Sequence, residues 1–119
     1  MRTRNALALT ALLLMMSLSP VISAADSTVT VNTTWSGSMT LTGNVTLANP
    51  TTEQVGQSGF IVFIQDATGG RTVSLGTDYE TAGGAGLTLS SAASATDVVP
   101  YIVAASGRIL LGAPQLAFA

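Results

Sequence analysis

Four acidic side chains in the second half of the chain are the groups best suited to chemistry: Asp66, Asp78, Glu80 and Asp97. Together with backbone carbonyls, they offer the oxygen ligands of a calcium site. The residues after Asp66, however, lack the second acidic or amide side chain, two positions on, that a calcium loop uses. An aspartate that caps a turn by bonding its own backbone is the simpler interpretation of Asp66. We therefore predict no metal site and no cofactor.

Asp78 and Glu80 also match the need of a glycosidase for two carboxyl groups. Their i, i+2 spacing would place both on one face of a strand. A small domain has little depth in which to desolvate an acid and raise its pKa, so we favour a solvated loop ahead of Gly83. The sequence has no histidine, lysine or cysteine to activate a nucleophile or hold zinc. We predict no catalytic residue and no enzymatic activity.

Arg71 follows two glycines, a pattern that can form an anion-binding nest. The alternative, which we favour, is a hairpin turn in which Arg71 pairs with Asp66 at the surface. Two arginines against six acidic residues give residues 26–119 a formal charge of −4. Nucleic-acid binding relies on clustered lysine and arginine, so the composition excludes nucleic acid as a partner.

Aromatic and large apolar side chains are the remaining candidates for binding. Trp35 lies beside a Ser-Gly turn, where it either covers one end of the core or binds a ligand such as a glycan. Tyr79 and Tyr101 also combine apolar area with a polar tip, and we expect Tyr101 in the core or at a subunit interface. The full set of candidate binding or interface residues is Trp35, Tyr79, Tyr101, Phe60, Phe63, Ile109 and Leu111.

The N-terminus has the order of a secretory signal peptide. Two arginines precede an apolar run of roughly a dozen residues, shorter than the ~20 needed to span a bilayer, and small residues follow at positions 23–25. We predict a leader over residues 1–25, cleaved after Ala24 or Ala25, and a single domain over residues 26–119. The only helix that we expect lies in the leader.

Alternation of apolar residues with threonine predicts short strands over residues 26–49. The segments TVTVNTT, GSMTLTG and GNVTLAN share a spacing that could represent two turns of a β-solenoid. Pro50 ends this pattern because proline cannot donate to a strand ladder.

Residues 60–64 are apolar at every position, which predicts a central strand buried on both faces. Residues 72–75 alternate again, and we expect them to pair back on residues 60–64 as a hairpin. A second hairpin is expected where residues 98–104 and 108–111 flank an Ala-Ser-Gly turn. Pro100 inside the first of these strands indicates an edge position or a bulge.

About eight short strands, one of them at residues 87–89, predict an all-β fold: a small antiparallel β-sandwich or jelly roll. Residues 56–119 would form its core. The chain has no cysteine and only 8% charged residues, so disulfides cannot stabilise it and apolar area must remain at the surface. Exposed apolar area usually marks a contact surface, and association is the remaining route to stability for a small domain.

The second half of the chain contains GQSG at 56–59, QDATGGRT at 65–72, GGAGLTLS at 83–90, TDVVPYIV at 96–103 and GRILL at 107–111. In this order, the segments resemble a small β-domain found near the ends of bacteriophage tail-fibre and other virion proteins. The resemblance implies a non-catalytic structural or attachment domain that associates with itself, as a homotrimer, in a virion.

A leader departs from this pattern because virion proteins are assembled in the host cytoplasm. The alternative is a secreted bacterial surface or filament subunit, in which residues 28–34 add to the sheet edge of a neighbour. A third interpretation, from a different class, is a carbohydrate-binding module that uses Trp35. The expected partners are copies of the chain, a cell-surface glycan or another structural protein, with no membrane contact after leader cleavage. The expected location is extracellular or at a cell surface, or the virion if a phage encodes the chain.

Overall fold

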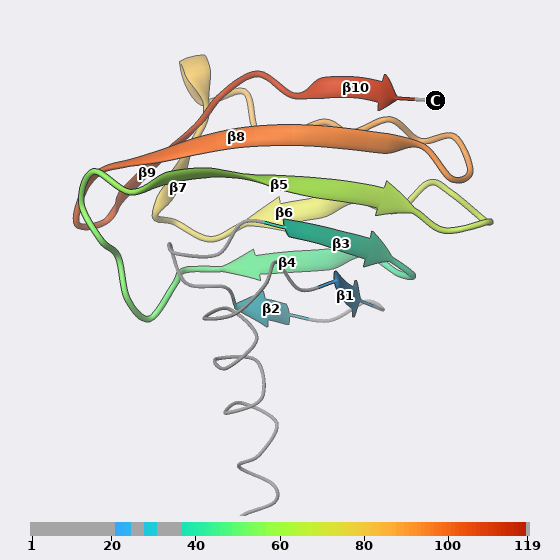
Figure 1. Cartoon of the computed structure of the whole chain (residues 1–119), viewed down its shortest axis with the longest axis horizontal. Helices are drawn as coiled ribbons and strands as arrows, with labels where there is room; N and C mark the ends of the chain where they lie inside the picture. Colours follow the sequence, from blue (N-terminus) through green and yellow to red (C-terminus); the bar gives the residue numbers. More distant parts are fainter. Residues whose placement is uncertain (1–20, 25–27, 31–36, 119) are drawn as a thin grey trace, which may run out of the picture.

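Our structure is a computed structural model, which describes residues 21–24, 28–30 and 37–118. Within these ranges the chain forms two β-sheets (Figure 1). The large sheet has the order β1-β3-β5-β8-β9-β7, with β10 also pairing with β8, and the small sheet has the order β2-β4-β6. The strands are β1 (Val21–Ala24), β2 (Thr28–Thr30), β3 (Gly37–Leu41), β4 (Val45–Ala48), β5 (Ser58–Gln65), β6 (Val73–Leu75), β7 (Tyr79–Glu80), β8 (Thr96–Ala105), β9 (Arg108–Leu111) and β10 (Gln115–Phe118).

The first six strands wind as a β-solenoid. Successive strands alternate between the two sheets, so that each turn of the chain adds one strand to each sheet. All pairs between successive turns are parallel: β1 with β3, β3 with β5, β2 with β4 and β4 with β6. The similar spacing of the threonine-rich segments therefore reflects a solenoid, as the sequence suggested.

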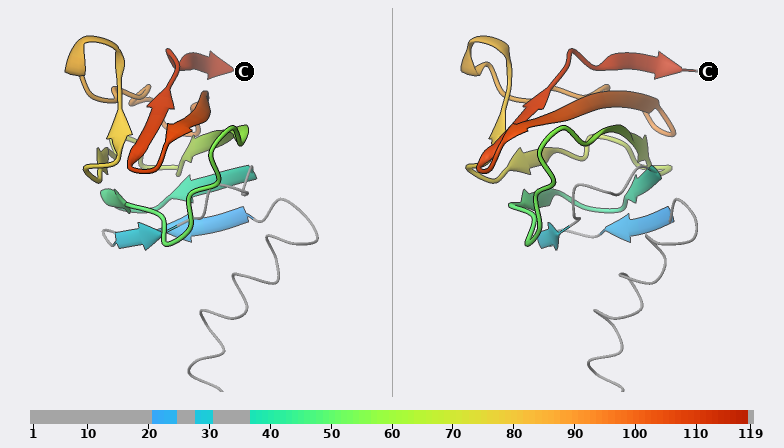
Figure 2. Two further views of the ribbon diagram at one scale, coloured as in Figure 1. Left: turned by 90° about the vertical axis from the view of Figure 1, so that its left-hand side faces the viewer. Right: turned by 60° about the vertical axis from the view of Figure 1, so that its left-hand side comes forward.

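After β6, the strand arrangement changes. β8 returns antiparallel along β5 and forms a hairpin with β9. β7 lies parallel to β9, and β10 lies antiparallel to the first part of β8. A short 3-10 turn, η1 (Ala82–Gly84), follows β7 and projects from the body of the sheets (Figure 2).

The core lies between the inner faces of the sheets. Every second residue of β3, β5 and β8 points into it, as the period of two requires. Leu75, Leu87 and Leu89 pack against it while partly buried. The buried apolar residues are Met39, Leu41, Val45, Leu47, Ile61, Phe63, Val73, Tyr79, Val99, Tyr101, Val103, Ile109 and Leu111.

The predicted all-β fold is confirmed, but its predicted antiparallel pairing needs correction. The pairs of β5 with β8, β8 with β9 and β8 with β10 are antiparallel, whereas the five other pairs of described strands are parallel. The hairpin predicted for residues 72–75 is also wrong, because β6 pairs with β4 in the opposite sheet. Alternation of apolar and polar residues predicts a strand but does not indicate which other strand it pairs with.

The predicted central strand is confirmed in position, since β5 lies between β3 and β8. It is not buried on both faces, because Phe60 on its outer face remains 50% exposed. The predicted edge position of Pro100 is also wrong, because β8 is an interior strand. Pro100 lies between the stretch of β8 that pairs with β10 and the stretch that pairs with β9, and its carbonyl accepts the N–H of Gly112 at 2.8 Å. Because the nitrogen and carbonyl of one strand residue face the same edge, its ring nitrogen points to this side and not to β5.

Three strands differ from the sequence prediction. Residues 87–89 form no strand, whereas β7 and β10 were not predicted. β1 occupies the last residues of the predicted leader, and the rest of the leader and Trp35 lie outside the described residues. No helix in the described part of the chain is long and apolar enough to cross a membrane.

Candidate interaction surface

The outer face of the large sheet carries an apolar surface across its two longest strands. Phe60, Val62 and Ile64 of β5 alternate with inward residues, and so do Val98, Pro100 and Ile102 of β8. The register places Phe60 opposite Pro100 and Val62 opposite Val98. Neighbouring side chains on one sheet face lie within contact range. We call these six residues, together with Leu110 of β9 opposite Ile102, the outer apolar surface.

Two members of this surface are unusually open to solvent. Phe60 is 50% exposed and Ile102 is 46% exposed. Beside them, Pro100, Ile102, Leu110 and Gly112 help to line a shallow hollow of about 340 Å³. The backbone of Gly112 passes so close to Pro100 that a Cβ on it would lie 2.8 Å from the proline Cγ. Gly112 therefore has no room for a side chain beside this hollow.

Polar residues border the outer apolar surface on both sides. On the β3 side lie Ser38 and Thr40, opposite Val62 and Ile64. On the other side, Arg108 of β9 donates two hydrogen bonds to Glu80 of β7, at 2.8 and 2.9 Å. The hydrogen bond from Arg108 lowers the pKa of Glu80 and raises that of Arg108. An apolar centre with a polar rim is the usual anatomy of a protein interface.

The segment QDATGGRT, which carries much of the family resemblance, forms a tightly bonded turn. Asp66 accepts the backbone N–H of Thr68 at 3.1 Å and of Gly69 at 3.0 Å. Its other oxygen pairs with the Arg71 guanidinium at 2.9 Å. The hydrogen bond from Arg71 is the largest cause that lowers the pKa of Asp66. The predicted turn cap and the predicted Asp66–Arg71 pair are both confirmed.

Gln65, the first residue of that segment, is buried and connects three parts of the chain. Its side-chain oxygen accepts the N–H of Arg71 at 2.9 Å, and its amide nitrogen donates to the carbonyls of Arg71 and Ser90 at 2.8 and 3.0 Å. Buried polar groups are stable only when bonded in this way. Gln65 was not among the predicted residues, although a glutamine at the end of an apolar strand was the available signal.

Asp97 has a comparable structural role in the segment TDVVPYIV. It is 2% exposed, and its two oxygens accept the backbone N–H of Ser90 at 2.6 Å and of Ala117 at 2.8 Å. Asp97 thus fixes β10 and the loop before β8 to the same carboxylate. Charge-assisted bonds of this kind are the stronger class of hydrogen bond.

The two acids proposed for a glycosidase do not converge on a shared substrate. Glu80 is paired with Arg108, while Asp78 forms a side-chain hydrogen bond with Glu53. This bond is the largest cause that raises the pKa of Glu53, whose carboxylate also accepts the N–H of Gly107. Among the described residues, no group of three or more acidic, histidine or cysteine side chains could hold a metal ion.

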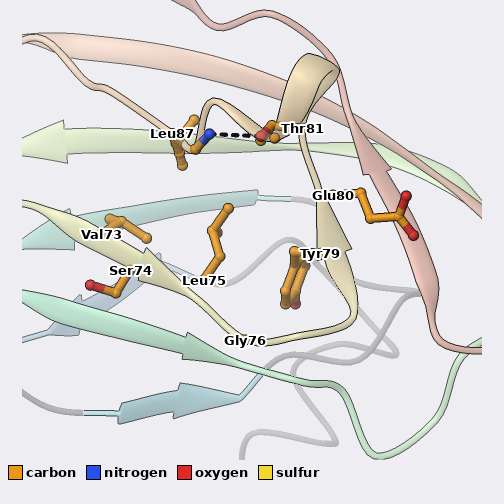
Figure 3. A pocket seen from close by; sticks show the side chains of 10 residues that line it. Val73, Ser74, Leu75, Gly76, Tyr79, Glu80, Thr81 and Leu87 are labelled. Atoms are coloured by element: carbon orange, nitrogen blue, oxygen red, sulfur yellow. Dashed lines mark hydrogen bonds between the residues drawn. The ribbon is translucent and has the colours of Figure 1, made fainter.

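A second hollow, of about 520 Å³, opens between β6 and the loop around η1 (Figure 3). Leu75, Tyr79 and Leu87 supply its apolar lining, and Thr81 accepts the N–H of Gly86 at 2.8 Å. Tyr79 is only 9% exposed, and burial is the main cause that raises the pKa of its hydroxyl. Its ring therefore offers no open face on which a sugar could stack.

The candidate residues from the sequence divide into three groups. Phe60 belongs to the outer apolar surface, and Trp35 lies outside the described residues. The other five side chains lie in the core, on the opposite face of the large sheet from Phe60: Phe63, Tyr79, Tyr101, Ile109 and Leu111. Ile102 and Leu110 were not among the predicted residues, although each directly follows one that was, Tyr101 and Ile109.

Within the described residues, the two sheets define an all-β domain. Residues 24–108 match a protein family described as "Putative phage tail fibre C-terminal domain". The match covers more than two thirds of the chain, so the protein belongs to this family. A search of curated proteins and a search of solved structures each found no match. Membership makes this a structural phage tail-fibre domain, associated with the virion or the cell exterior.

Proposed function

We propose that the domain is a non-catalytic attachment module that is exported and associates with copies of itself through the outer apolar surface. The observation that carries this proposal is the exposure of Phe60 and Ile102 within the outer apolar surface. Outward residues of β5 and β8 include no charged side chain, since Asp97, the one acid in these strands, points inward.

Self-association follows from the energetics of that face. Burying one large apolar side chain contributes about 1.5–3 kcal/mol. Two copies that meet through the surface bring neutral faces together, although residues 26–119 carry a net negative charge. The repelling charges lie outside the contact, so their effect is screened over about 8–10 Å at ordinary salt. A homotrimer is the assembly that the resemblance to tail-fibre domains supports.

The proposal of export depends on the predicted leader. Whether the protein is exported decides between two locations in which the outer apolar surface would act. In a virion, the surface would join copies at the end of a fibre. In a secreted surface or filament subunit, it would join copies outside the cell. The sequence of residues 1–25, with its arginines, apolar run and small residues, supports the second setting.

The test is sedimentation velocity of the exported protein at micromolar concentration, with the unchanged protein and two variants. Replacing Phe60 and Ile102 together by serine should weaken association roughly 100-fold or more, because both side chains lose their burial. Val55, in a loop and 59% exposed, supplies the matched control: Val55→Ser should associate as the unchanged protein does. Circular dichroism of each variant verifies that the fold is retained.

The proposal is contradicted if the unchanged protein sediments as a monomer. It is equally contradicted if the Phe60→Ser/Ile102→Ser protein remains folded and associates with unchanged affinity. A loss of association in Val55→Ser would move the interface to the loop before β5.

A further inference from the structure

Leader cleavage at the predicted position would remove a strand of the large sheet. β1 pairs with β3 along its whole length, from Val21 opposite Ser38 to Ala24 opposite Leu41. Cleavage after Ala24 or Ala25 falls immediately behind β1, while β2 stays in the small sheet on β4. The large sheet would then end at β3, and the β3 backbone groups that face β1 would be left unpaired. Met39 and Leu41, the inward residues of β3, are fully buried while β1 is present.

The mature chain cannot refill this edge from its own N-terminus. A replacement for β1 must precede β2, which begins at Thr28. Cleavage leaves at most residues 25–27 ahead of it, fewer than the four residues of β1. The edge of β3 must therefore stay open or receive a strand from another chain.

β10 has the properties of that incoming strand. It is four residues long, as β1 is. In the described part of the chain, its only strand neighbour is β8, which leaves its second edge unpaired. Leu116 and Phe118 are 53% and 54% exposed, so two large side chains of β10 find no burial within the subunit. Both β10 and residues 21–23 lie outside the span matched by the family.

The strand directions also agree. β5 and β10 are both antiparallel to β8, and β3 is parallel to β5. β10 is therefore parallel to β3, and the strands β3, β5, β8 and β10 lie side by side across the sheet (Figure 1). A second copy in the same orientation would present its β10 to β3 in the direction that β1 has in the precursor.

We propose that leader cleavage removes β1 and opens the edge of β3, which then pairs with β10 of a second copy of this chain. The contact joins opposite edges of one sheet, so it is head-to-tail and generates an open polymer. The inference rests on the export part of the proposed function. It uses a different surface from the outer apolar surface, so the two can fail separately.

The first measurement is the intact mass of the exported protein, which should begin at Ala25 or Asp26. Electron microscopy and sedimentation should then show polymers. The Leu116→Asn/Phe118→Asn protein should lose polymers and keep the association that depends on Phe60 and Ile102. The matched control Val55→Asn, which also makes an exposed apolar side chain polar, should polymerise normally.

A fourth protein, produced without export and beginning at Val21, retains β1 and should not polymerise. An exported protein that keeps residues 21–24 overturns the proposal, as does one that forms no polymers. So do polymers that persist in the Leu116→Asn/Phe118→Asn protein or that form equally when β1 is retained. Circular dichroism separates a loss of polymers from a loss of fold.

Discussion

The carboxylate of Asp97 accepts the backbone N–H of Ala117 at 2.8 Å, so a buried acid of β8 fixes the last strand of the chain. Its second oxygen accepts the N–H of Ser90 at 2.6 Å. One carboxylate therefore connects β8, β10 and the long loop before β8. This arrangement explains why an aspartate lies in an otherwise apolar strand.

Asp97→Ala should destabilise the fold by about 3 kcal/mol or more, because it leaves two backbone donors without an acceptor. Asp97→Asn keeps one oxygen acceptor and should cost less. Urea unfolding followed by circular dichroism measures both. Equal stabilities for the alanine variant and the unchanged protein would contradict this role for Asp97.

The pair of Asp66 and Arg71 predicts a loss of stability in acid. The Arg71 guanidinium lowers the pKa of Asp66 below its ordinary value of 3.8. The stabilisation is therefore present above the unfolded-state pKa and is lost as the pH falls through the lower folded-state pKa. Melting temperatures at pH 6 and pH 2.5 should differ less in Asp66→Asn than in the unchanged protein. An unaltered difference would show that the pair has no effect on stability.

Glu53 predicts a pH effect of opposite sign. Its hydrogen bond with Asp78 raises the pKa of Glu53 above 4.5, so the folded chain holds a proton that the unfolded chain releases. Stability should fall as the pH rises from the unfolded-state value through the folded-state value. Glu53→Gln should remove this decline between pH 4 and pH 7, as seen in melting temperatures. If the melting temperature of Glu53→Gln declined as much as that of the unchanged protein, another titrating group would cause the decline.

The glycines of the Asp66 turn offer a matched pair of variants. Gly69 and Gly70 both have positive φ, of +75° and +74°. A Cβ on Gly69 would lie 2.6 Å from the carbonyl oxygen of Ser91, whereas a Cβ on Gly70 would meet open space. Gly70→Ala should cost about 1–2 kcal/mol from backbone strain alone, and Gly69→Ala about 1–3 kcal/mol more from the clash. Equal losses in urea unfolding would contradict the close approach.

Much of the local structure was predictable, because it depends on residues near one another in sequence. The Asp66–Arg71 turn and the hairpin of β8 and β9 follow from glycine and aspartate chemistry over a few residues. The pairing of β6 with β4 was not predictable in this way. Both strands alternate apolar and polar residues. That pattern fits pairing with the preceding strand in a hairpin as well as pairing with the strand one solenoid turn earlier.

The candidate surface was predictable only in part for a related reason. Residues 98–104 are mostly apolar, so the sequence does not show which alternate set faces the core. The structure places Tyr101 inward and Ile102 outward. Phe60 was among the predicted residues because it belongs to the apolar run of the central strand, but its 50% exposure is a property of the packed sheet that the run itself does not reveal.

The central claim is association through the outer apolar surface, and sedimentation velocity of the exported protein at micromolar concentration tests it most directly. In the Leu116→Asn/Phe118→Asn protein, in which copies no longer join through β10, the account predicts an oligomer, which adding Val55→Ser preserves and adding Phe60→Ser and Ile102→Ser converts to a folded monomer. A monomeric unchanged protein, or an oligomer of unchanged affinity when Phe60 and Ile102 are both serine, would contradict it.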